Sequence, residues 1–211
     1  VQAGLIGALG QVSCSFRIPA RFGGWRERMP EVLIEDLAIH HLDTIRFITG
    51  RNGARLYAHS FNPAWSWYGG NACATIELQL EGGLPVSYGG SWVARGPRSS
   101  WDGELLLVGA DGALLLREDE TVWHYLGEAE TPQPLALPTL APHGLARGLS
   151  LFTAALRGEG AAQPDGEDNI HSLALTSAAV ASARTGQPVA IDQHLRTAGW
   201  SPRLRHQHQQ R

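Results

Sequence analysis

The feature that most limits the fold of this chain is a strict alternation of apolar and polar residues in segment 72–80. The apolar positions are Ala72, Ala74, Ile76, Leu78 and Leu80, and the polar side holds Cys73, Thr75, Glu77 and Gln79. A period of two predicts a strand with one buried face. A second strand segment, 85–93, follows after only four residues, so the two segments are expected to form an antiparallel hairpin.

The rest of the chain extends this sheet and adds a few helices. Further strands are predicted in segments 11–18, 55–61, 104–109, 113–117, 121–126 and 189–191, and helices in segments 35–50, 143–157 and 167–185. Six to eight strands that are joined mostly by short turns form an antiparallel sheet. Because the strands do not alternate with helices in a βαβ series, we predict an α+β fold with a large, mostly antiparallel sheet and helices on one face.

The predicted helix in segment 35–50 carries two stripes of side chains. One stripe is apolar apart from a histidine and consists of Leu37, His41, Ile45 and Ile48; the other consists of Asp36, His40, Asp43 and Phe47. Asp36 and His40 are four residues apart, so both side chains can act on one bound molecule. Taken alone, these residues do not define a site, because an aspartate near a helix start is usually a cap.

Composition and short motifs exclude several classes of function. The net charge is −3, which gives no strong attraction to nucleic acid or to an anionic membrane. No apolar run approaches the ~20 residues of a membrane helix, and no signal peptide opens the chain. The glycines of segment 4–10 lack the dinucleotide spacing and a preceding strand. Cys14 and Cys73 have no CxxC spacing, so we expect free thiols in a reducing cytoplasm.

The pattern Asp-x-x-x-His-x-x-Asp, on a helix that ends in Phe-Ile-Thr-Gly, resembles the second domain of the Gfo/Idh/MocA oxidoreductases. Further phrases agree in order and spacing, in segments 7–12, 25–26, 86–92, 109–112 and 171–186. The resemblance implies a C-terminal domain like those of dihydrodipicolinate reductase and glyceraldehyde-3-phosphate dehydrogenase. It would occupy residues 1–192, with a disordered tail in 193–211 and without the family's N-terminal Rossmann domain.

The resemblance also implies a reaction and site residues. The family transfers hydride between NAD or NADP and a hydroxyl carbon of a sugar, cyclitol or related substrate. His40 aligns with the proton acceptor and Asp36 with a residue that orients the substrate or the histidine, whereas Asp43 aligns with an aspartate expected to be structural. The candidates for substrate contact are Arg17, Trp25, Arg26, Trp101 and His143.

The chain has neither the glycine fingerprint nor any lysine, both of which the family uses. We therefore expect this chain to bind no cofactor and to be inactive alone, as the substrate-binding and oligomerisation half of an enzyme. The expected partners are a small-molecule substrate and further copies of the chain, which would meet through a sheet face that bears Tyr57, Trp123 and Tyr125.

Two other functions are weighed against this one. The chain could be a stand-alone sugar-binding or oligomerisation module without redox chemistry. A metal-dependent hydrolase or isomerase would use His40, His41 and Asp43, but the adjacent histidines diverge by about 100° on a helix and cannot readily share one ion. No metal site is therefore expected.

Overall fold

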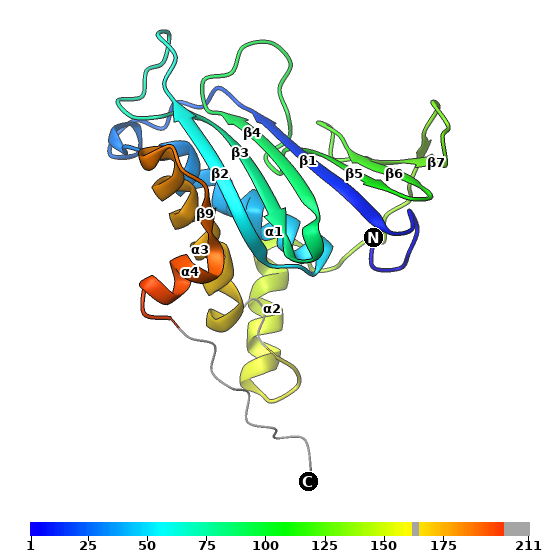
Figure 1. Cartoon of the computed structure of the whole chain (residues 1–211). Coiled ribbons are helices and arrows are strands. Elements are labelled where there is room, and N and C mark those ends of the chain that lie inside the picture. Colours follow the sequence, from blue (N-terminus) through cyan, green and yellow to red (C-terminus); the bar gives the residue numbers. More distant parts are fainter. Residues whose placement is uncertain (162–164, 201–211) are drawn as a thin grey trace.

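A computed structural model of the protein describes residues 1–161 and 165–200. These residues form a nine-stranded sheet in the order β8-β7-β6-β5-β1-β4-β3-β2-β9 (Figure 1). The strands are β1 Leu9–Arg17, β2 Gly53–Phe61, β3 Cys73–Leu80, β4 Pro85–Ser91, β5 Glu104–Gly109, β6 Gly112–Leu116, β7 Val122–Leu126, β8 Gln133–Pro134 and β9 Val189–Ala190.

All neighbouring strands pair antiparallel except β1 and β4, which run parallel. The α+β fold class is therefore confirmed, and so is the hairpin of β3 and β4, whose strands pair from Cys73 and Ser91 to Gln79 and Pro85. Strand β8 was not predicted. Gln133–Pro134 has only two residues, too few to show an alternating pattern.

Among the described residues, three of the four α-helices lie where the sequence predicted them, and the fourth, α4, was not predicted. They are α1 Ile39–Thr49, preceded by a π-helical turn at Ile34–Ala38, then α2 Gly144–Leu156, α3 Gly166–Thr185 and α4 Ile191–Thr197; short 3₁₀ turns occupy Arg26–Arg28 and Glu81–Gly83. Gly50 closes α1 in the left-handed conformation at φ 65°, where its amide donates to the carbonyl of Arg46. Asp165 caps α3 by accepting a hydrogen bond from the amide of Asp168.

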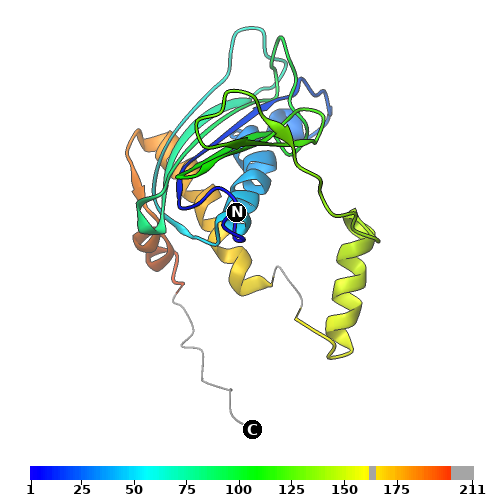
Figure 2. The same cartoon turned by 90° about the vertical axis from the view of Figure 1, so that its right-hand side faces the viewer.

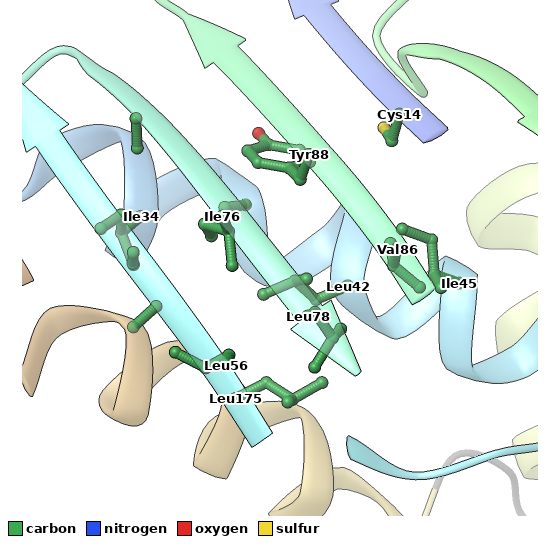
Figure 3. Packing of buried hydrophobic residues seen from close by; sticks show 14 of the residues in the cluster. Cys14, Ile34, Leu42, Ile45, Leu56, Ile76, Leu78, Val86, Tyr88 and Leu175 are labelled. Carbon is green, nitrogen blue, oxygen red and sulfur yellow. The ribbon is translucent and has the colours of Figure 1, made fainter. Parts of the chain in front are cut away.

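The core lies between the sheet and the helices α1 and α3 (Figure 3). Leu175 of α3 packs under Leu56 of β2, while Leu42 and Ile45 of α1 face the middle strands (Figure 3). A Cβ on Gly53 would lie 2.4 Å from Leu175, so glycine permits this close approach of α3 to β2. Burying each such side chain contributes about 1.5–3 kcal/mol, which holds α1 firmly against the sheet.

Helix α2 differs from the others because it stands away from the sheet (Figure 2). None of its residues is buried, and Leu145, Phe152 and Leu156 are 81%, 54% and 73% exposed. The sequence correctly predicted a helix with an apolar face here, but within the described residues no element covers that face.

The segment after strand β9 forms a helix and not a loop. We expected a disordered tail from residue 193, whereas α4 continues to Thr197 and Leu195 is buried. Ile191 and Leu195 lie one helical turn apart and share the buried side, which accounts for the helix. Residues 201–211 lie outside the described residues. Across the described ranges, no helix has the length and apolarity needed to cross a membrane.

Candidate functional site

Asp36 and His40 lie at the junction of the π-helical turn and α1. The π-helical turn buries Ile34, Leu37 and Ala38. Asp36 therefore lies on the side of the turn that faces away from the core. The Asp36 side chain is 15% exposed, and His40 is exposed to solvent. Side chains four residues apart on a helix are neighbours, so a half-buried carboxylate stands one turn before an accessible imidazole. π-helical turns occur often at functional sites.

Arg26 joins this pair from the loop that precedes the helix. Its Nε donates to both carboxylate oxygens of Asp36, at 3.0 and 3.2 Å. The guanidinium also lies over two aromatic rings, 4.9 Å from the centroid of Trp25 and 5.3 Å from that of Phe22. The ion pair is partly exposed, so it orients the Asp36 carboxylate more than it stabilises the fold. The structure thus brings together Trp25, Arg26 and Asp36; Phe22 was not predicted.

His41 points the other way and is buried, as its place in the apolar stripe predicted. Its Nε2 lies 2.9 Å from the carbonyl oxygen of Trp101, and its Nδ1 lies 3.2 Å from the hydroxyl of Tyr88. Burial lowers the pKa of His41 by more than the hydrogen bond to the Trp101 carbonyl raises it. Sequence reasoning missed Tyr88, because a tyrosine on the buried face of a strand looks like any core residue.

Trp101 belongs to the β4–β5 loop, residues 92–103, and its indole is 55% exposed. The ring packs against Trp92 at 5.7 Å and Phe16 at 6.4 Å between centroids. Because Phe16 also contacts His41, this aromatic cluster lies on the helix side of the sheet. Trp101 is therefore a half-exposed aromatic side chain on the same side of the sheet as α1.

Arg17 lies elsewhere. It follows Phe16 in β1, so its side chain projects from the opposite face of the sheet. Its guanidinium is held by Ser15, by the Pro97 carbonyl at 3.2 Å and by Glu104 at 3.6 Å. The structure does not bring Arg17 together with Asp36. Its backbone amide and carbonyl instead bind Ser99, which attaches the β4–β5 loop to β1.

His143 also lies apart from Asp36 and His40. It is the exposed residue before α2, the helix that stands away from the sheet (Figure 2). Its side chain makes no capping hydrogen bond to that helix. Within the described residues, no group of three or more His, Cys, Asp or Glu side chains is arranged to hold a metal ion. His40 and His41 diverge, one exposed and one buried, as expected from their adjacency.

Asp43 makes hydrogen bonds within the fold that were not predicted from the sequence. It accepts hydrogen bonds from Ser172 of α3 and from Arg46, whose side chain is 6% exposed. Arg46 also donates to Ser172 at 2.6 Å, to Asp168 at 2.8 Å and to Asn52 at 2.9 Å. This network joins α1 to α3, so Asp43 contributes to the fold. Its spacing from Arg46 is visible in the sequence, but its partner on α3, Ser172, is 129 residues away.

The glycines of segment 4–10 form no phosphate-binding loop. A Cβ on Gly7 would lie 2.4 Å from the Asp111 side chain, so this segment packs against the β5–β6 turn. The amide of Asp111 donates to the carbonyl of Ile6, and that of Ala110 to the carbonyl of Ala8. These backbone groups are therefore not available to a pyrophosphate, which agrees with rejecting a dinucleotide fingerprint.

The chain belongs to the GFO/IDH/MocA family. The family's sequence model, described as the GFO/IDH/MocA C-terminal domain, matches residues 1–115 and so covers more than half of the chain. The resemblance recognised in the sequence is confirmed, and the nine-stranded sheet is the fold of solved relatives. An oxidoreductase from Agrobacterium radiobacter, crystallised with NAD⁺, L-tartaric acid and magnesium, has a TM-score of 0.78 at 24% identity and covers 91% of this chain.

Two curated relatives have named activities. A D-apiose dehydrogenase of Paraburkholderia graminis is 32% identical over 78% of this chain and 46% of its own length. A 1,5-anhydro-D-fructose reductase of Ensifer adhaerens is 26% identical over 83% of this chain and 53% of its own length. The chain spans about half the length of the curated relatives it matches, and 59% of the Agrobacterium oxidoreductase.

The burial of His41 predicts a pH dependence of stability. Burial lowers the pKa of both His41 and His171 below the ordinary 6.5 of the unfolded chain. Below that value the unfolded chain binds more protons than the folded chain, so the free energy of unfolding should fall as the pH is lowered through 6.5. Urea unfolding at pH 8 and pH 5.5 measures this slope, and His41→Gln should make it shallower. An unchanged slope in that variant would contradict the assignment.

Proposed function

We propose that this chain is the substrate-binding and oligomerisation half of an NAD(P)-dependent oxidoreductase that acts on a hydroxyl group of a sugar, cyclitol or related polyol. The observation that carries the proposal is the accessible His40, one helical turn after an Asp36 carboxylate whose orientation Arg26 fixes. Family membership and two relatives named for action on sugars support the substrate class.

His40 is the proton acceptor in this proposal. Oxidation of an alcohol removes a hydride from carbon as the hydroxyl proton leaves, so a base must stand at the hydroxyl. An imidazole suits this task because its ordinary pKa lies near working pH. A nicotinamide cofactor, held by a part of the enzyme outside this chain, would receive the hydride. Segment 4–10 of this chain forms no phosphate cradle, which supports a cofactor site outside this chain.

The neighbours of Asp36 supply substrate contacts. Arg26 uses its Nε for Asp36, so its two terminal nitrogens remain to donate to substrate hydroxyl or carboxylate oxygens. Trp25 and Trp101 are 60% and 55% exposed and offer aromatic faces to the C–H side of a sugar ring. Arg17, on the opposite face of the sheet, acts here only through the β4–β5 loop. The free cysteines agree with a cytoplasmic enzyme.

Substitution of His40 tests the proposed reaction. In an enzyme that unites this chain with its cofactor-binding part, His40→Gln should lower kcat for sugar or polyol oxidation by about 10²–10⁴-fold, since the base is lost. Asp36→Asn should also lower kcat, because the hydrogen bonds that orient it weaken. Glu35→Gln, at the exposed neighbouring carboxylate, is the matched control and should leave kcat unchanged. A kcat for His40→Gln within twofold of the parent enzyme would refute the role of His40.

The open face of the sheet is proposed as a homo-oligomer interface. This face carries Tyr57 and Phe61, both 41% exposed, and Val108, 37% exposed, with few charges between them. Such exposed apolar surface commonly marks a protein interface. Sedimentation of the chain at high micromolar concentration should show dimers or larger species, and Tyr57→Arg should shift the chain toward monomer because it would bury an unpaired charge. Monomer alone at that concentration would count against the interface.

A further inference from the structure

In its neutral form, His41 donates one hydrogen bond and accepts another, and the Trp101 carbonyl decides which nitrogen does which. The Trp101 carbonyl can only accept, so His41 Nε2 carries the hydrogen and donates to it over 2.9 Å. The other ring nitrogen, Nδ1, is then a lone pair and accepts from the Tyr88 hydroxyl over 3.2 Å. In the neutral ring, which burial favours by lowering the pKa of His41, both nitrogens are therefore used. Complete burial raises the pKa of Tyr88, which keeps its hydroxyl able to donate.

The bond to Trp101 is one of several attachments of the β4–β5 loop, which is also held through Trp92, Val93, Pro97 and Ser99. At the end of β1, Ser99 exchanges two hydrogen bonds with the backbone of Arg17, at 2.9 and 3.1 Å. On the helix side, His41 attaches the loop to α1. Gly103 ends the loop at φ 78°, where a Cβ would lie 3.1 Å from the Cys14 sulfur and 3.7 Å from His41 Nε2. The loop therefore packs directly on the His41 ring.

We propose that His41 is a positioning residue, which fixes the Trp101 end of the β4–β5 loop to α1 and thereby sets the exposed Trp101 indole relative to His40. This inference rests on the proposed function, in that Trp101 and His40 serve one substrate site. Adjacent residues of one helix point in different directions. His40 thus faces the substrate, while the buried His41 fixes the β4–β5 loop, which forms one side of the site. A substrate wall held by packing and hydrogen bonds retains its geometry better than a free loop.

The loop itself offers a direct readout of this attachment. Arg95 and Arg98 are exposed residues of the β4–β5 loop, so trypsin can cut there when the loop opens. Arg55 lies in β2, paired on both sides, and is cut only after wider unfolding. The ratio of loop cleavage to cleavage at Arg55 therefore separates loosening of the loop from a general loss of stability.

The test compares three variants of the 211-residue chain. His41→Leu removes both hydrogen bonds and should raise loop cleavage about tenfold relative to cleavage at Arg55. His41→Gln keeps an N–H donor for the Trp101 carbonyl and should stay within about threefold of the unchanged chain. Tyr88→Phe removes the hydroxyl that donates to His41 Nδ1 and should give an intermediate increase. It also provides a test if His41→Leu does not fold.

The proposal is overturned if cleavage at Arg95 and Arg98 rises no more than at Arg55 in the variants that fold, or if His41→Gln loosens the loop as much as His41→Leu. In the whole enzyme, His41→Leu should raise KM by a larger factor than it lowers kcat, whereas His40→Gln lowers kcat. An enzyme without oxidoreductase activity would refute the proposed function while leaving the cleavage result unchanged, so the two failures are distinguishable.

Discussion

The burial of one side of α1 against the sheet is the constraint on which the rest of the structure depends. Leu42 and Ile45 enter the core, and His41 is hydrogen-bonded inside it. With that side fixed, His40 of the second stripe is exposed to solvent. A polar ring is tolerated in the core because both of its nitrogens are paired, and leaving either unpaired would cost about 1–3 kcal/mol.

The same burial explains how distant loops meet at one end of the sheet. The loop before α1 brings Arg26 to Asp36, and the β4–β5 loop brings Trp101 to His41. Each loop is attached to the helix by one hydrogen-bonded contact and to its surroundings by aromatic packing. A site assembled in this way has rigid walls although its residues come from segments that are far apart in the sequence, which suits a small polar substrate.

Much of the fold was predictable because its signals are local. Alternation predicted most strands, glycines such as Gly50 and Gly186 are the residues expected at helix ends, and either Asp165 or Asp168 could mark the start of α3. The long-range contacts had no such signal. Nothing near Asp43 indicates Ser172 on α3, and nothing near His41 indicates Tyr88. The π-helical turn also escaped prediction, since its apolar pattern fits an α-helix equally well. An amphipathic pattern predicted the apolar face of α2, but a pattern does not say what covers it.

The candidate site was likewise predictable only where a local motif marks it. Asp36, His40 and Arg26 were found through a motif and its resemblance to a family, and the structure brings Arg26 to Asp36. The central claim is that the chain supplies the substrate side of the reaction, while the nicotinamide is held elsewhere. Calorimetric titration of the 211-residue chain with NAD⁺ and NADP⁺ tests it most directly. The account predicts no heat of binding for either nucleotide. Micromolar binding of either one would contradict it, because a nucleotide site would then exist within this chain.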